Sequence, residues 1–488
     1  MVYQHGIGVI EKPTSIPQPE ESLSAVQVVF GTAPINLVEN PTDVCNKPLL
    51  IRSFDEAKEK LGYSDNWKDF TLCEVMDASF KKFKVGPVVF INVLDPSIHK
   101  KSSEPTSIKI TNKEGLIDKE GVLLSTLVVK SADGATTYMK GQDYLVSFNQ
   151  NGKPLISVLS SGQMANVTEI QVTFDELNPS AVTNANIIGG YDAATNKYKG
   201  FELIQTIYPT LGVVPNTLLA PGFSQQAEVG NVLVAKSTKI NGSFNATNIL
   251  DVLGTTKEIA GENKKANGFN DKTSIVCWPK AKIGEKTYRF STIVAAAIAK
   301  RDSENENVPY KSPSNLKIAI SDMVNDNGDS VFLDQIQGNV LNGMGIVTAI
   351  NMGGWRTWGN NTAAYSFDPN DSSVMDPKDR FIAVRRMFDW WGNSFIQEYF
   401  DKVDDSTNYR LIESVVDSEN IRANGFKAKG QIAGAKIEFN QEENSISNIL
   451  NGKIKFVQKM AFYTPAELIE NELEFDPNML SEAIFGGE

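Results

Sequence analysis

Few residues in this sequence have the chemistry of a catalytic or metal site. The 488-residue chain contains 2 histidines and 3 cysteines. A Ser-His-Asp triad would have to use His5 or His99, and we interpret both as surface histidines. Cys45, Cys73 and Cys277 lie far apart and form no CxxC pair, which argues against a zinc site and a disulfide framework. With no GxSxG motif and no P-loop either, we predict no catalytic residue, no cofactor and no metal, and a protein that is not an enzyme.

One cluster of residues is unusual for its combination of types. The segment GGWRTWGN at 353–360 brings two tryptophans, an arginine and three glycines together in a predicted loop. Trp355 and Arg356 could form a ligand-stacking site. Alternatively, Gly354, Trp355, Arg356 and Thr357 form a structural motif, a tight turn whose tryptophans fill a core, because glycine allows backbone geometry that other residues resist. We favour the structural interpretation and keep the ligand site as the alternative.

Charge argues against two large classes of partner. The 47 basic and 59 acidic residues give a formal net charge of −12, so the chain lacks the overall basic character that a phosphate backbone or an anionic membrane requires, and only a local basic face stays open as the alternative. No run of 18 apolar residues occurs, so we expect no membrane insertion. The start of the chain has no basic segment followed by an apolar one, and this predicts no signal peptide. The three scattered cysteines suit a reducing cytoplasm.

The elements that must position any functional residue alternate between strands and helices. Apolar runs predict buried strands at 24–33, 87–94, 216–222, 245–252 and 274–279. Apolar residues at intervals of three or four predict helices at 54–61, 71–84, 201–211, 291–302 and 380–400. This alternation indicates an α/β core with a mixed sheet and flanking helices.

The hydrophobic pattern of the sequence changes between residues 97 and 197. Apolar residues no longer recur at helical spacing. Instead, short runs in which apolar and polar residues alternate, such as 143–149 and 169–174, are separated by turn dipeptides. At least five strands at this spacing predict an all-β insertion domain that resembles a sandwich. The predicted division is therefore a core in two parts, 21–96 and 198–475, interrupted by the insertion at 97–197, with extended arms at 1–20 and 476–488.

The two ends of the chain differ from the core. Ile7, Gly8, Val9 and Ile10 are followed by three prolines before residue 20, which favours an extended arm, with a frayed terminus as the alternative. Near the other end, residues 452–463 and 466–475 are predicted strands. In the second of these, Ile469, Leu473 and Phe475 share one face and glutamates share the other.

Several segments together resemble contractile tail sheath proteins of bacteriophages and phage-tail-like particles. Each segment alone is weak evidence for the family, but the order and spacing of the segments together are specific to it. The similar segments are GIGVIEKP (6–13), SAVQVVFGTAP (24–34), VVPNTLLAPGFS (213–224), PYKSPSN (309–315), LNGMGIVTAINMGGWRTWG (341–359), DRFIAVRRMFD (379–389), NGKIKF (451–456) and TPAELIENELEFDP (464–477). The predicted insertion has no counterpart that we match.

The resemblance implies a structural role. A sheath protomer polymerises into a contractile helical tube around an inner tail tube and drives that tube through the host envelope. Its partners would be neighbouring sheath subunits, the inner tail tube protein, the baseplate and the tail terminator, and its location the virion tail, after assembly in the bacterial host cytoplasm. The resemblance also implies that both arms add strands to sheets of neighbouring subunits, with Ile7, Gly8, Val9, Ile10, Ile469, Leu473 and Phe475 as contact residues.

Two other classes of function stay open from the residues alone. An α/β hydrolase or binding enzyme would use the segment GGWRTWG as its site, but it would need a nucleophile and a base that the sequence does not offer. A surface adhesin would use the β insertion as its binding module, but it would need a secretion signal.

Overall fold

A computed structural model describes residues 20–21, 23–371 and 373–486 of the chain. The predicted N-terminal contact residues Ile7, Gly8, Val9 and Ile10, and also His5, lie outside the described residues.

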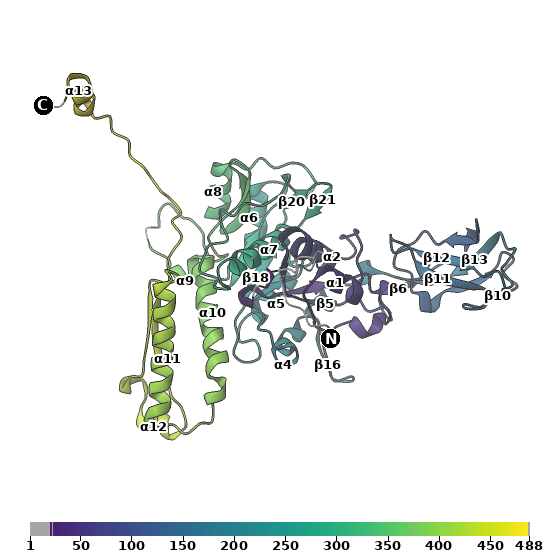
Figure 1. Cartoon of the computed structure of the whole chain (residues 1–488), viewed down its shortest axis with the longest axis horizontal. Coiled ribbons are helices and arrows are strands. Elements are labelled where there is room, and N and C mark those ends of the chain that lie inside the picture. The colour runs from purple at the N-terminus through teal and green to yellow at the C-terminus, as the bar shows by residue number, and fades with distance from the viewer. Residues whose placement is uncertain (1–19, 22, 372, 487–488) are drawn as a thin grey trace, which may run out of the picture.

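The centre of the protein is an eight-stranded sheet (Figure 1). Six inner strands run parallel, and the strand at each edge runs antiparallel to its neighbour. Across the sheet the strands are β24 (Trp355–Trp358), β23 (Ile346–Asn351), β19 (Ser274–Cys277), β18 (Thr247–Asp251), β17 (Thr217–Leu219), β2 (Gln27–Gly31), β5 (Val88–Asn92) and β3 (Leu49–Ile51). The predicted mixed α/β architecture is confirmed.

The inner strands form where the sequence has continuous apolar runs. Every residue of β2, β5, β18 and β19 is buried, as expected for parallel strands that are covered on both faces. Parallel neighbours need a crossover between them, and here helices supply it. The helices around the sheet are α1 (Phe54–Leu61), α2 (Leu72–Met76), α5 (Ala227–Lys236), α6 (Lys257–Ala266), α7 (Phe290–Ser303) and α8 (Gln335–Gly343).

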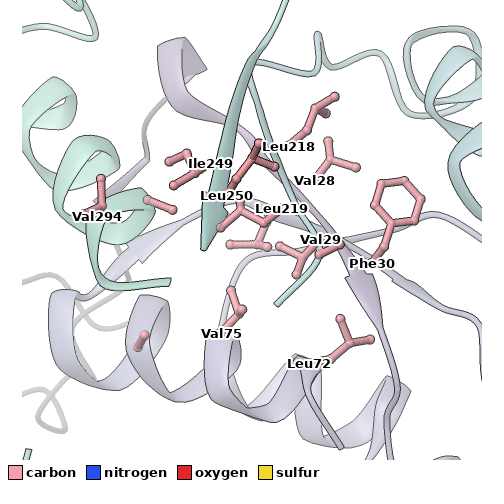
Figure 2. Close-up of a cluster of buried hydrophobic side chains, with 14 of the residues drawn as sticks. Val28, Val29, Phe30, Leu72, Val75, Leu218, Leu219, Ile249, Leu250 and Val294 are labelled. Atoms are coloured by element: carbon pink, nitrogen blue, oxygen red, sulfur yellow. The ribbon is translucent and has the colours of Figure 1, made fainter. Parts of the chain in front are cut away.

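The main hydrophobic core lies between this sheet and its helices. Figure 2 shows Leu72 and Val75 of α2 and Val294 of α7 pointing toward strand side chains such as Val29 and Leu250. All five side chains are at most 1% exposed. Burying an aliphatic side chain of this size contributes about 1.5–3 kcal/mol to the stability of the fold. This cluster therefore stabilises the central sheet, to which the β body and the helical hairpin are attached.

A smaller β body projects from the core at one end (Figure 1). It has two antiparallel sheets with their own buried cluster, which includes Val129, Ile156 and Ile170. The strands of its two sheets are β7 (Thr106–Lys109), β8 (Glu114–Leu116), β9 (Val128–Ser131), β10 (Thr137–Tyr138), β11 (Tyr144–Phe148), β12 (Pro154–Val158) and β13 (Glu169–Thr173). The predicted boundaries of an insertion, 97 and 197, stay a prediction.

Two short strands connect the β body to the core. β6 (Lys100–Ser102) pairs with β14 (Asp175–Leu177) in antiparallel register, and the Asn178 N–H donates to the His99 carbonyl at 2.8 Å. The chain therefore enters and leaves the β body side by side. Beyond this neck, α3 (Asn184–Ile188) already packs on the main core through Ile187.

A helical hairpin extends from the opposite side of the sheet (Figure 1). It comprises α10 (Ile382–Tyr399) and α11 (Tyr409–Ala428), and α11 carries a two-stranded sheet of β25 (Gly434–Glu438) and β26 (Val457–Ala461). Trp391 of α10 lies with its ring centroid 5.5 Å from that of Phe426, and the Arg422 guanidinium lies 4.5 Å from the Trp391 ring. This aromatic contact joins the two helices.

The C-terminal segment differs from the prediction. The strand expected at 466–475 does not form, because in the described part of the chain no strand pairs with it. The chain runs extended away from the body and then forms a short helix, α13 (Pro477–Phe485), so the prediction of an extended arm at 476–488 was wrong for these residues (Figure 1). Every residue from Ala466 to Gly486 is exposed.

Candidate functional site

The tryptophan-containing segment is a β-hairpin at the edge of the central sheet rather than a loop. β23 and β24 pair in antiparallel register, with Ile350 opposite Arg356. The turn between them uses Gly353 and Gly354 at φ 64° and 111°, a region that residues with a Cβ rarely adopt. The two glycines are therefore required by the turn that brings the tryptophan strand back onto the sheet.

The side chains of this hairpin bond to the protein itself. Thr357 is buried, and its Oγ1 donates to the Pro313 carbonyl at 2.6 Å. Arg356 Nη1 donates to Asn315 Oδ1 at 3.1 Å, and Trp355 Nε1 donates to the Ser321 carbonyl at 3.3 Å. These contacts hold the segment 313–321 over β24. They support the structural interpretation of the motif, which stays a prediction.

We expect Trp355→Ala to lower the free energy of unfolding by about 2 kcal/mol. Trp355 is half-buried against the main core, so the loss should be smaller than the ~3–5 kcal/mol of a fully buried aromatic residue. Urea denaturation followed by circular dichroism would measure it, with Trp355→Phe as the control that keeps a ring. A variant of unchanged stability that had lost binding of a small molecule would instead favour the ligand site.

The position where α/β enzymes bind ligands is filled by the protein's own side chains. Such folds bind ligands outside the carboxyl ends of parallel strands, and here that region holds Arg289, Glu74 and Asp251. Arg289 Nη1 donates to Glu74 Oε2 at 2.5 Å, and its backbone N–H donates to Glu74 Oε1 at 2.6 Å. Only about 70 Å³ remains open beside Asp251 and Arg289, well below the ~300–1,000 Å³ of a small-molecule site.

The buried carboxyl groups of this region are satisfied by internal donors. Ser291 donates to Asp251 through its backbone N–H at 3.0 Å and through Oγ at 2.5 Å. Burial raises the pKa of Glu74 and of Asp251, against the lowering effects of Arg289 on Glu74 and of the Ser291 hydrogen bonds on Asp251. A perturbed pKa in a cleft can mark a catalytic group, but these two carboxyl groups face structural partners.

One interpretation of a histidine was wrong. His99 is buried rather than on the surface, because it lies at the neck of the β body and its Nδ1 accepts the Asp95 N–H at 2.9 Å. Burial lowers its pKa. Within residues 20–21, 23–371 and 373–486, no group of three or more His, Cys, Asp or Glu side chains is arranged to hold a metal ion. Over the same residues, no helix combines the length and apolar character needed to cross a membrane.

The C-terminal contact residues predicted from the sequence lie on the extended segment. Ile469, Leu473 and Phe475 are 85%, 87% and 75% exposed. The segment is attached at its base by an ion pair between Arg380 and Glu467, which sequence reasoning missed. Large apolar side chains held in water at alternating positions are unfavourable for an isolated chain, so this segment has the character of an unfilled contact surface.

The sheet of β25 and β26 offers open edges on the hairpin of α10 and α11. Within the described residues these two strands pair only with each other. A two-stranded sheet is marginal in water, and here one side of it is supported by Ile432 and Phe462, which belong to the aromatic cluster of the helical hairpin. The sequence predicted a strand at 452–463 but no strand at 434–438, so this two-stranded sheet could not be inferred from it.

A buried ion pair ties Ser24, near the start of the described residues, to α7 and α10. Arg386 of α10 pairs with Asp302 of α7 at 2.5 Å, with side chains 4% and 1% exposed. Ser24 Oγ donates to Asp302 Oδ2 at 2.8 Å, and Arg386 Nη2 donates to the Ser24 carbonyl at 3.4 Å. Residues just after the predicted N-terminal arm are thus tied to both helices.

Comparison with known proteins identifies what this arrangement resembles. The chain is 27% identical to the tail sheath protein of Burkholderia phage BcepMu over 501 aligned positions, which cover 98% of each chain. It is 26% identical to the tail sheath protein of Escherichia phage P2 over 61% of this chain and 71% of that protein. The chain is a homologue of the phage tail sheath proteins. No protein-family model matches it.

Solved structures share the sheath fold. The chain superimposes on a protein in the contracted sheath complex of an extracellular contractile injection system with a TM-score of 0.56, at 13% identity, covering 98% and 99% of the two chains. The sheath tail protein from Desulfitobacterium hafniense gives a TM-score of 0.52 at 12% identity, covering 93% of this chain and 100% of that one. The resemblance predicted from the sequence is confirmed, and the sheath homologues carry no hydrolase or adhesin name.

Proposed function

We propose that the chain is a tail sheath protomer that polymerises into a contractile helical tube around an inner tail tube and drives that tube through the host envelope. One observation carries the proposal: the match to a phage tail sheath protein extends over 98% of both chains. The exposed C-terminal segment and the open β25–β26 sheet support it, because among the described residues neither has the further partner strand that a polymer would supply.

Subunits are joined in this proposal by strand addition. The segment 466–475 of one subunit, and the N-terminal residues 7–10 of another, pair with the free edges of β25 and β26 in a neighbour. Main-chain hydrogen bonds supply the affinity, and alternate side chains such as Ile469 and Leu473 set the register. The arms are covalent links, so subunits can slide and rotate on contraction without separating. Two packings of different stability then supply the energy of contraction.

The further partners follow from this role. They are the inner tail tube protein, the baseplate and the tail terminator, and the protein acts in the virion tail after assembly in the bacterial host cytoplasm. The protomer needs no active site, cofactor or metal. The filled strand-end region around Arg289 and Glu74 supports a protein that is not an enzyme.

Negative-stain electron microscopy of the purified full-length chain tests the proposal. We expect rings or tubes that grow in number with protein concentration, since each arm reaches another copy. Monodisperse monomers at every concentration, together with a measurable hydrolytic activity or binding to a cell surface, would overturn it in favour of the enzyme or the adhesin.

The β body should be dispensable for assembly. Its neck brings the chain in at His99 and out at Asn178 side by side, so a short Gly/Ser linker can join these positions without moving the core. We propose that the body lies on the outside of the tube. Replacing residues 100–177 should leave tube formation unchanged in electron micrographs. Soluble, folded protein that no longer formed tubes would show that the body carries a subunit contact.

A further inference from the structure

An apolar groove crosses the surface between α6 and α8. It has a volume of about 860 Å³ and continues along the segment 363–367. Ile336 and Val340 of α8 and Phe367 line it and are 69%, 40% and 65% exposed. Side chains of this size in a concave surface mark a contact site rather than ordinary solvent-facing residues.

The floor of the groove carries positive charge. Lys264 is 7% exposed, and its Nζ donates to the carbonyls of Met344 and Ala363 at 2.8 and 2.7 Å. Burial lowers the pKa of Lys264 to about 8. Lys265 lines the same groove, and no acidic residue does. The occupant of the groove should therefore combine an apolar face with an acidic group.

The C-terminal helix α13 has both properties. Met479, Leu480, Ala483 and Ile484 recur at helical spacing and form one face, and Glu482 lies at the border of that face. Every residue of α13 is exposed. A nine-residue helix spans about 14 Å and has too few residues to be stable in water without a partner.

We propose that α13 of one subunit docks through its apolar face into the α6–α8 groove of a second copy. A neighbour is the occupant because the extended segment before α13 carries the helix away from its own body (Figure 1). The groove also adjoins the place where the C-terminal segment leaves the core, since Tyr365 and Phe367 line both the groove and the cavity beside Pro465 and Leu468. This inference rests on the proposed function, because copies are held side by side only in a polymer.

Site-specific crosslinking between two full-length chains tests the docking. One chain carries Val340→Cys in the groove and the other carries Ile484→Cys on the helix. The two are mixed, treated with a short bis-maleimide reagent and separated on a denaturing gel. Cys73 and Cys277 are buried, and burial raises the pKa of Cys45 to about 12, so the native thiols react slowly. We expect a two-chain product from the mixture and not from either chain alone.

Matched variants make the result specific. Asn478→Cys lies on the side of α13 opposite its apolar face, and Ala266→Cys lies on α6 outside the groove. Used in place of Ile484→Cys and Val340→Cys respectively, each should give roughly tenfold less two-chain product. Adding Ile336→Glu should reduce the product by a similar factor, because it places a charge in an apolar contact. Equal yields from all positions would overturn the docking.

Electron microscopy of the same samples separates this inference from the proposed function. Tubes without the two-chain product overturn the docking and leave the sheath function standing. The product without tubes supports the docking and counts against the sheath function. Samples with neither overturn both. A product formed within one doubly substituted chain at high dilution would show that α13 occupies its own groove, and would also overturn the proposal.

Discussion

A chain that ends at Leu468 should fold like the full-length protein and form no tubes. The removed residues are exposed wherever the structure describes them, so few folded contacts are lost, and the ion pair between Arg380 and Glu467 is retained. We expect the free energy of unfolding to change by no more than about 0.5 kcal/mol. Circular dichroism on heating measures the folding, and negative-stain electron microscopy measures assembly.

A single substitution near the N-terminus tests the other arm in the same way. Val9→Pro removes one backbone donor from the predicted N-terminal strand and disrupts its register, so it should also abolish tubes. Val9→Thr keeps the donor and a β-branched side chain, and should assemble normally. If the truncated chain or the Val9→Pro chain still formed tubes that contract, strand exchange through the arms would be the wrong description of this polymer.

Asp302→Ala should lower the free energy of unfolding by about 3–5 kcal/mol, because it leaves the buried Arg386 without its counter-charge. It also removes the acceptor of Ser24 Oγ, so we expect the residues that follow the N-terminal arm to detach from α7 and α10. Urea denaturation monitored by tryptophan fluorescence measures the first effect. Hydrogen exchange at residues 23–26 measures the second.

An exposed ion pair nearby gives the control. Lys429 and Glu306 lie 2.6 Å apart with side chains 57% and 62% exposed, so Glu306→Ala should change stability by less than about 1 kcal/mol. The double variant Asp302→Leu, Arg386→Met should recover most of the loss, because apolar residues can replace a buried pair without leaving a charge unpaired. A loss in Asp302→Ala no larger than that in Glu306→Ala would show that the buried pair is not a structural anchor.

The elements predicted from the sequence are those that are buried on every side, or those whose buried residues recur at one regular spacing along the chain. β2, β5, β18 and β19 are buried on both faces and appear as apolar runs, and α10 buries residues spaced by three or four. The sequence did not predict helix α11, because this helix buries only Val415, Glu419 and Ala423. A buried stripe this narrow gives no amphipathic period. Its signal was Asn408, whose side chain accepts the Leu411 N–H at the helix start.

The C-terminal segment shows a different limit of sequence reasoning. Alternation of Ile469, Leu473 and Phe475 with glutamates is a strand pattern, yet a strand needs a partner, and this chain supplies none among its described residues. The following helix was signalled by Asp476 and Pro477, which cap it and occupy its first position. The contact residues proposed for the polymer therefore rest on the family resemblance, because a pattern within one chain cannot identify a partner strand in another chain.

The neck of the β body has a mechanical consequence. β6 and β14 run side by side between the core and the β body, so tension that pulls the β body away from the core is shared by two backbones in parallel. The hydrogen bonds between antiparallel strands lie perpendicular to the strands and carry none of this load. With the β body on the outside of the tube, as proposed, drag on it during a rapid change of tail length would reach the central sheet through covalent bonds, and the neck could bend without lengthening.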